Sequence, residues 1–217
     1  MTAPTHKQYA ICGAFFVAIA LYRMGLTEIN YYLALPLIIL VSKYGALFPD
    51  LDHDWCNVKN KNVPNWVINK VIRITGGRHR SWQTHSIDIV ILLTIAVSII
   101  PVRLYDANKI SLVNKEVMSI ILIGFMSGWV SHILSDMLTS SGVRILFFWK
   151  KRISLVPKRL GRRYFKTGAD WESFCYKTMR VVNVIIGLFS IAYPIIYNGG
   201  IEKMLKNDNS ILWGLLK

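Results

Sequence analysis

The chain has few cysteines, few acidic residues and no recognisable linker. These shortages bear on disulfide bonds, on the kind of partner and on the number of domains. Its 217 residues include three cysteines that form no close pair, and an odd number provides no disulfide framework. Cys56, which lies beside an Asp-His cluster, is the one cysteine to consider as a metal ligand. Internal repeats, Gly/Ser linkers and low-complexity tracts are missing as well. We therefore expect a single domain over residues 1–217.

Acidic side chains are scarce beside basic ones, and this imbalance limits the kind of partner. The chain has 12 Asp and Glu against 26 Lys and Arg, which gives a formal net charge of +14. Such a charge is compatible with nucleic acid binding, but 53% of the residues are apolar and the mean hydropathy is +0.37. In a membrane protein the same excess is typical of Lys/Arg-rich cytoplasmic loops. The composition favours membrane lipid as the main partner.

Several apolar runs approach the roughly 20 residues that are needed to cross a bilayer. They cover residues 9–22, 31–49, 86–102, 117–139 and 181–197. We predict an all-α fold, a polytopic membrane helical bundle with four or five transmembrane helices. A cleaved signal peptide is the alternative for the first run, although cleavage there would discard His6. Residues 65–75 mix apolar and basic side chains in a pattern that predicts a short interfacial helix.

Histidine is also rare, and all five histidines occur in four short clusters near the ends of the apolar runs. Imidazole and carboxylate together are the ligands of zinc-class metals. If the chain crosses the membrane at every run, all four clusters reach the same membrane face. This agreement predicts a metal site at one end of the bundle. Its pool of candidate ligands is His6, Asp50, Asp52, His53, His79, His85, His132 and Asp136.

Basic residues indicate which face this is. Most of the 26 Lys and Arg flank the clusters, mainly within residues 50–85 and 140–180. Because positive charge concentrates on the cytoplasmic side of membrane proteins, we expect the N-terminus and the site to face the cytoplasm.

The fourth apolar run carries polar and small residues at a four-residue spacing. Gly124, Gly128, His132 and Asp136 share one helix face. The adjacent stripe is Ser127, Ser131 and Ser135. Small residues let helices approach closely in lipid, and ionisable residues inside a span are usually functional. His132 and Asp136 are one turn apart, so they can bind one ion or form a simple interhelical hydrogen bond.

The acidic run after the second span is either a ligand loop or a solvated helix end. Extended backbone would aim Asp50 and Asp52 the same way, whereas a helix would pair Asp50 with His53 or Asp54. The sequence leaves both geometries open.

Charged residues around His79 and His85 have their own candidate roles. Arg78 and Arg80 carry guanidinium groups that match phosphate oxygens, which predicts substrate binding. Asp88 is either an acceptor that binds the far ring nitrogen of His85 and orients the ring, or an ordinary interfacial acid.

These motifs resemble the YdjM-type bacterial inner-membrane proteins, which are described as metal-dependent hydrolases. The resemblance extends from His6 to about Glu172 and rests on four ordered motifs. They are Thr5-His6, residues 45–53, residues 79–86 and residues 128–143. Residues 167–172 are similar to a further family element, which implies a role for Glu172 near the site. The family pattern His-Arg-Gly-x-Thr-His-Ser is one residue longer here, so whether His79 and His85 reach the same metal stays open.

The family is in turn similar to the zinc-dependent phospholipase C and nuclease superfamily, all-helical enzymes that bind two or three zinc ions through His and Asp. The resemblance therefore implies a membrane-bound metal-dependent hydrolase with two or three Zn²⁺, or Mn²⁺, and Glu172 or Asp52 as general base. Such metals activate water and neutralise phosphoryl oxygens. A site at the membrane surface favours phospholipid headgroups.

Three alternatives remain at this point. A nuclease is one, because basic loops also bind nucleic acid. A transporter is another, although transport sites usually lie near the bilayer midplane. The third is a membrane regulator with a structural metal, which four ligands would close.

Overall fold

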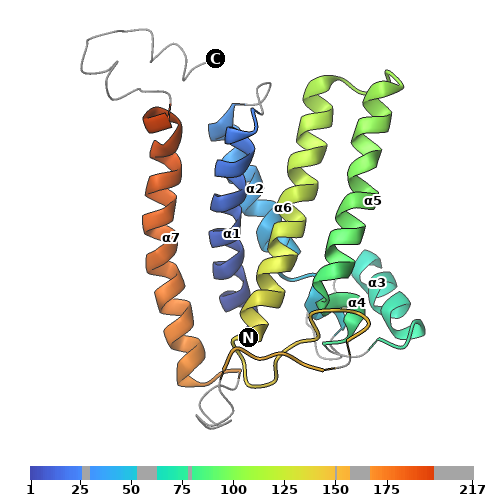
Figure 1. Cartoon of the computed structure of the whole chain (residues 1–217), viewed down its shortest axis with the longest axis vertical. Coiled ribbons are helices and arrows are strands. Elements are labelled where there is room, and N and C mark those ends of the chain that lie inside the picture. The colour runs from blue at the N-terminus through green and yellow to red at the C-terminus, as the bar shows by residue number, and fades with distance from the viewer. Residues whose placement is uncertain (26–29, 53–62, 78–79, 150, 157–166, 198–217) are drawn as a thin grey trace.

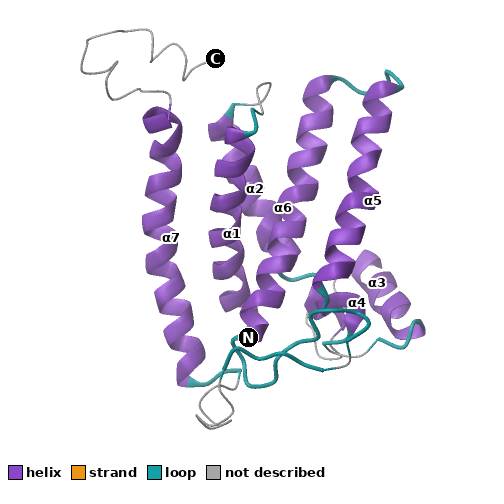
Figure 2. Ribbon diagram, viewed as in Figure 1, coloured by secondary structure: helices purple, strands orange, loops and turns teal. Residues whose placement is uncertain are grey.

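The structure is a computed structural model that describes residues 1–25, 30–52, 63–77, 80–149, 151–156 and 167–197 (Figure 1). Helices dominate this part of the chain (Figure 2). Within the same ranges, β-structure is limited to an isolated bridge between Val143 and Ile153. The predicted all-α fold is therefore confirmed.

Five long helices form the body of the molecule and run side by side in Figure 1. They are α1 (Ala3–Arg23), α2 (Tyr31–Gly45), α5 (Ile87–Asp106), α6 (Leu112–Met137) and α7 (Asp170–Tyr197). Three short elements accompany them: η1 (Pro49–Asp52), α3 (Val63–Ile74) and α4 (Trp82–His85).

Four of the helical segments are long and apolar enough to cross a membrane. They are Tyr31–Asp52, Ile87–Asp106, Leu112–Met137 and Asp170–Tyr197. The fifth long helix, α1, is not among them, and its first turns carry the polar residues His6, Lys7 and Gln8. This agrees with the expected four or five spans.

Helix α6 is the centre of the bundle, because α1, α2 and α5 all pack against it, whereas α7 packs against α1. The contact with α2 is a contact between backbones. A Cβ added to Gly128 would overlap the carbonyl oxygen of Ser42, and one added to Gly45 would overlap that of Phe125. The Ser42 hydroxyl donates to the carbonyl of Gly124 across the same interface, at 2.7 Å. Small residues therefore fix α2 and α6 in one register.

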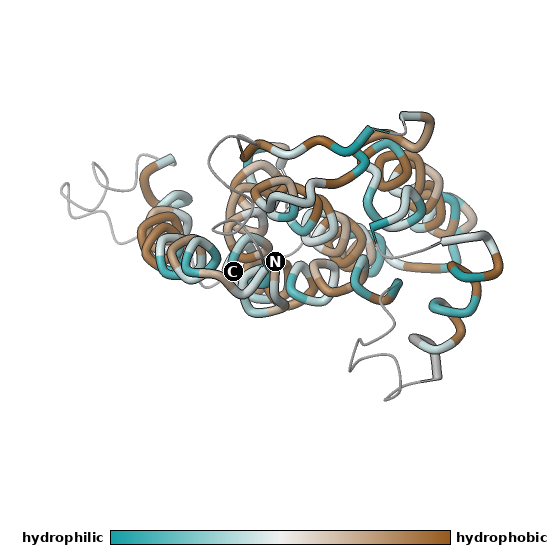
Figure 3. The backbone as a smooth tube through the Cα atoms, turned by 90° about the horizontal axis from the view of Figure 1, so that it is seen from below, coloured by the Kyte–Doolittle hydropathy of each residue, from teal (hydrophilic) through white to brown (hydrophobic). Residues whose placement is uncertain are grey.

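The outer helices expose apolar side chains that suit a bilayer. On α5, Ile91, Leu92 and Ile95 are exposed, and on α7 so are Val184 and Leu188. Seen from below in Figure 3, the long helices carry hydrophobic residues around much of their circumference. Lipid can cover these faces without the cost of hydrating apolar surface.

The polar clusters gather at the lower end of the bundle in Figure 1. The N-terminus, η1, α4, the end of α6 and the start of α7 all lie there, whereas α7 ends at the opposite side. The described clusters therefore lie at one end of the bundle, as expected.

Helix α3 lies beside this lower end, outside the bundle (Figure 1). It occupies the segment predicted as an interfacial helix. Trp66, Val67, Val71 and Ile74 are exposed on it. Asn69 is buried and donates to the carbonyl of Leu51, which ties α3 to η1.

Candidate metal centre

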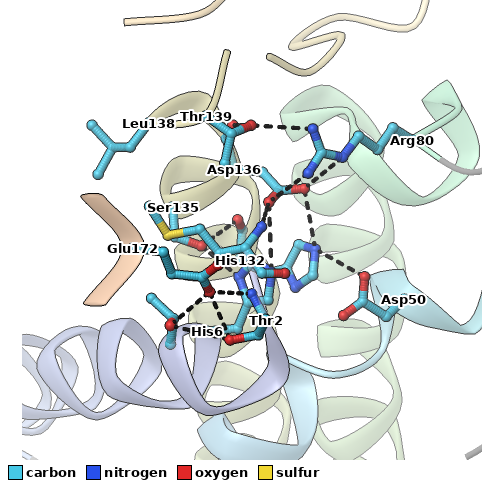
Figure 4. Close-up of polar contacts among 12 residues, drawn as sticks. Thr2, His6, Asp50, Arg80, His132, Ser135, Asp136, Leu138, Thr139 and Glu172 are labelled. Atoms are coloured by element: carbon cyan, nitrogen blue, oxygen red, sulfur yellow. Dashed lines mark hydrogen bonds and ion pairs between the residues drawn. The ribbon is translucent and has the colours of Figure 1, made fainter. Parts of the chain in front are cut away.

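Four ionisable side chains from three helices meet at the lower end of α6. His132 and Asp136 project from α6 one turn apart, and they are 0% and 1% exposed. The ring of His6, from α1, stacks on that of His132 with 3.7 Å between the ring centroids. The ring of His85, from α4, meets His132 edge-on at 5.2 Å. Figure 4 shows His6, His132 and Asp136 turned toward one another.

The orientation of His132 is that of a candidate metal ligand. Its Nδ1 donates to the backbone carbonyl of Ala46 at 2.6 Å, which leaves a lone pair on Nε2. That Nε2 is buried and has no hydrogen-bond partner. It lies 3.7 Å from Asp50 Oδ1 and 3.7 Å from Asp136 Oδ2. A lone pair that faces two carboxylates is repelled by both unless a proton or a metal ion lies between them, and the imidazole and carboxylates present fit a metal ion.

The separations between the candidate ligand atoms fit the same reading. His6 Nε2 lies 3.5 Å from Asp136 Oδ1, and His85 Nε2 lies 3.7 Å from Asp136 Oδ2. These distances are too long for hydrogen bonds. His85 Nε2 is thereby placed as a candidate ligand atom, whereas His6 Nε2 donates to the carbonyl of Met1 at 2.9 Å. Two ligands of a tetrahedral zinc with bonds of 2.0–2.2 Å stand about 3.3–3.6 Å apart. Such atoms gather in two groups, His6 with His132 and Asp136, and Asp50 with His85 and His132.

Of the two geometries that the sequence left open, the acidic run adopts the helical one, as a 3₁₀ turn, while His53 and Asp54 lie outside the described residues. Asp50 and Asp52 lie in η1, a 3₁₀ turn, and their side chains diverge. Asp50 faces His132. Asp52 instead accepts from the hydroxyl of Thr84 at 2.6 Å and from the backbone N–H of Arg80 at 3.0 Å.

Asp52 and Thr84 together support His85. The Thr84 hydroxyl lies 2.8 Å from His85 Nδ1, and Asp52 Oδ2 lies 3.4 Å from the same nitrogen. A carboxylate behind the far nitrogen of a histidine orients the ring and makes it a better metal ligand. The sequence predicted Asp52 as a metal ligand and as a general base. In the structure its Oδ2 lies beside His85 Nδ1, behind the ring.

Arg80 is held at Asp136. Its Nε lies 3.1 Å from Asp136 Oδ2, and its Nη2 donates to Oδ1 at 3.1 Å (Figure 4). Its Nη1 also donates to the hydroxyl of Thr139 at 3.1 Å. The guanidinium therefore contacts both oxygens of the Asp136 carboxylate. The same oxygens also face the imidazoles of His6, His85 and His132. The amino group of Met1 also donates to Asp136 Oδ1, at 2.6 Å.

This placement differs from the substrate contact expected for Arg80. The side chain is 7% exposed and engaged with the protein itself. Its backbone φ of 59° lies in the left-handed region, which costs a non-glycine residue about 1 kcal/mol or more. The surrounding contacts hold Arg80 in this conformation. Its position indicates that Arg80 orients the Asp136 carboxylate.

Replacing Arg80 with lysine should weaken metal binding. Lysine keeps the charge but loses the planar fork that fixes the carboxylate. We expect the metal affinity to fall about tenfold or more, as for other residues that orient ligands. Isothermal titration of the metal-depleted protein with Zn²⁺ measures this, with exposed Arg152→Lys as the matched control. Equal affinity in both variants would show that Arg80 does not orient the ligand.

Glu172 anchors the N-terminal segment. Its Oε1 accepts from the hydroxyls of Thr2 and Thr5, at 2.6 and 2.8 Å, and from the backbone N–H of Thr2. Its Oε2 accepts from the backbone N–H of Gly168 at 2.6 Å. Both oxygens are thus engaged in joining the starts of α1 and α7, next to His6. Glu172 therefore lies near the site, as predicted. Its described contacts hold the N-terminal segment against the start of α7.

Asp88 lies away from the expected position behind His85. Its carboxylate accepts from the backbone N–H of Ile89 and from that of Phe147, each at 2.9 Å. It therefore ties α5 to the loop that follows α6. Four further sequence candidates lie outside the described residues. They are His53, Cys56, Arg78 and His79.

Sequence reasoning missed three supporting groups. Ser135 accepts from or donates to His6 Nδ1 at 2.6 Å, and its place in the serine stripe was a signal for this. Thr84 stood directly before His85 and was a second signal. For the carbonyl of Ala46 the sequence carried no signal. A backbone carbonyl is present at every residue, and this one meets His132 only because of the way α2 ends.

Comparison with known proteins gives a family and nothing more specific. The YdjM inner membrane protein family matches residues 1–201. Searches of curated proteins and of solved structures gave no match. The match covers all five long helices and every described side chain of the metal centre. The chain therefore belongs to the YdjM family of inner membrane proteins.

Proposed function

We propose that this inner membrane protein is a metal-dependent hydrolase of phosphate esters, and that its substrate is a phospholipid headgroup at the cytoplasmic surface. The observation that carries the proposal is the buried lone pair of His132 Nε2, which faces Asp50 and Asp136. The similarity to zinc-dependent phospholipases and nucleases, inferred from the motifs, supplies the reaction class.

The residues that would hold an ion are Asp50, His85, His132 and Asp136. His6 Nε2 and Asp136 Oδ1 would join a second ion only by releasing Met1, whose carbonyl and amino group they contact at 2.9 and 2.6 Å. This donor set of imidazole and carboxylate suits Zn²⁺, and Mn²⁺ is the runner-up. When bound, such an ion supplies a nucleophile at neutral pH and neutralises charge on phosphoryl oxygens. His53 and His79 complete the pool of ligands that the sequence proposes.

The protein side chains around the ion divide the remaining work. Asp50 is the most accessible, with a side chain 23% exposed, so substrate is expected to enter beside it. Arg80 fixes Asp136, and Glu172 fixes the segment that bears His6. Both expected bases accept hydrogen bonds, Asp52 from Thr84 and Arg80 and Glu172 from the N-terminal segment. Asp52 is the one that lies beside a candidate ligand, His85, and we therefore propose Asp52 for the proton-accepting role.

The surroundings of the site favour a lipid substrate. Phe147, Phe148 and Trp149 are exposed on the loop after α6, and Phe147 contacts Trp82 with ring centroids 6.2 Å apart. Lys70 lies over the ring of Trp66 on α3. Aromatic and basic side chains of this kind settle at headgroup depth. The Lys/Arg excess at this end supports the cytoplasmic orientation.

Assays on protein in lipid nanodiscs test the function. We expect hydrolysis of the mixed phospholipids at a phosphodiester bond, detected as loss of the parent lipid, that stops on chelation and returns with Zn²⁺ or Mn²⁺. Single- and double-stranded DNA should remain intact under the same conditions. Metal-dependent cleavage of DNA with lipids untouched would replace this proposal by a membrane nuclease. Metal binding without hydrolysis of either would favour a regulatory protein.

A further inference from the structure

A groove on the membrane-embedded surface lies between α1 and α5, with α6 as its floor. It has a volume of about 250 Å³, and its lining includes Val17, Val90, Thr94, Met126, Ser127 and Val130. Both α1 and α5 pack against α6, and the groove follows the space between them. It lies within segments that are long and apolar enough to cross a membrane.

The lining presents hydrocarbon rather than polar groups. Thr94 donates its hydroxyl to the carbonyl of Val90 at 2.6 Å, so this oxygen is engaged within its own helix. Ser127 is the other hydroxyl in the lining, and it lies on the side of α6 that faces Gly13 of α1. A hydrocarbon chain needs no hydrogen-bond partners and fits such a surface, whereas a polar ligand would lose its hydration uncompensated.

The lower end of the groove leads to the metal centre. Val130 precedes His132 by two residues on α6, and Val90 lies about one turn after His85 at the start of α5. Trp129 packs with Val90 in one buried cluster and donates its indole N–H to the carbonyl of Thr84 at 2.6 Å. Thr84 in turn contacts Asp52 and His85. Packed side chains, Trp129 among them, therefore connect the lower end of the groove with the site.

We propose that this groove binds an acyl chain of the membrane lipid whose headgroup reaches the His/Asp centre, an inference that rests on the proposed function. The lipid enters sideways from the bilayer, and its chain lies along α6 between α1 and α5. The groove then sets the distance between the chain and the phosphate. A substrate without an acyl chain cannot use this contact, which separates lipids from nucleic acids.

Photolabelling tests the groove without requiring turnover. The protein is placed, with chelator, in nanodiscs of phosphatidylethanolamine and phosphatidylglycerol that contain a phosphatidylethanolamine with a mid-chain diazirine. We expect label to concentrate on the groove-lining peptides of α5 and α6. Thr94→Trp fills the groove and should reduce this labelling several-fold. Leu92→Trp, on the exposed face of α5, should leave it unchanged.

Two outcomes would contradict the proposal that the groove binds an acyl chain. One is label spread evenly over the outer faces of α5 and α7. The other is an unchanged pattern in Thr94→Trp protein that remains folded by circular dichroism. Groove labelling by a protein that hydrolyses no phospholipid would count against the proposed function and leave the lipid-binding groove standing. Hydrolysis of phospholipid without groove labelling would support the proposed function and would count against the lipid-binding groove.

Discussion

Replacing His132 with glutamine should remove most of the bound metal. The imidazole Nε2 faces both Asp50 and Asp136, and its Nδ1 is held by Ala46, so no neighbour can take its place. We expect the affinity for Zn²⁺ to fall by at least about 100-fold, the upper end of the loss seen even for residues that only orient ligands. Competition against a fluorescent zinc chelator, on metal-depleted protein in detergent, measures the change.

The matched control is Glu116→Gln on the same helix. Glu116 is also buried, at 8% exposure, but it lies near the opposite end of α6. This variant should keep the metal affinity of the unchanged protein. Arg159→Ala should keep it as well, because the basic residues are expected to act in orientation and lipid contact. Equal metal loss in all variants would indicate general misfolding and would remove His132 from the ligand set.

Replacing Gly128 with alanine should unfold the site end of the bundle. The added Cβ would collide with the Ser42 carbonyl and approach the backbone nitrogen of Ala46 at 2.9 Å. Backbone atoms cannot rotate aside, so α2 must move away from α6. We expect a loss of roughly 3 kcal/mol in stability, at the high end for overpacking. Thermal unfolding in detergent, followed by circular dichroism, measures this loss.

Gly124→Ala provides the comparison one turn earlier on the same face. Its Cβ would stand 3.4 Å from the nearest atom, the carbonyl oxygen of Ile38, which is an ordinary contact. We therefore expect a much smaller effect for this variant. If Gly124→Ala and Gly128→Ala unfolded at the same temperature, the close α2–α6 contact would be wrong.

Hydropathy predicted the helices well because burial in lipid leaves a strong signal. The runs 31–49, 86–102 and 117–139 correspond to α2 with η1, to α5 and to α6. The other boundaries moved for a physical reason. Helices α1 and α7 extend beyond the apolar runs, to Ala3 and Asp170, because their first turns carry polar residues at the site end. A hydropathy pattern does not detect polar helical turns.

The candidate site was predictable as a list of residues and less so as a geometry. Alternation of spans brought His6, His85, His132 and Asp136 to one end, and the structure agrees. The division of roles depends on tertiary contacts that no spacing reveals. Arg80 contacts Asp136 from a backbone with positive φ, and Glu172 meets Thr2 and Thr5 because α7 packs beside α1.

X-ray absorption at the zinc edge, on protein purified in detergent with its natural metal content, tests the metal centre most directly. We predict at least one tightly bound divalent ion per chain, with nitrogen and oxygen ligands at about 2.0–2.1 Å and scattering from imidazole rings. The imidazole signal should weaken in His132→Gln protein. A chain that carries no metal after purification and binds none on titration would contradict the metal centre, as would ligation by sulfur at about 2.3 Å.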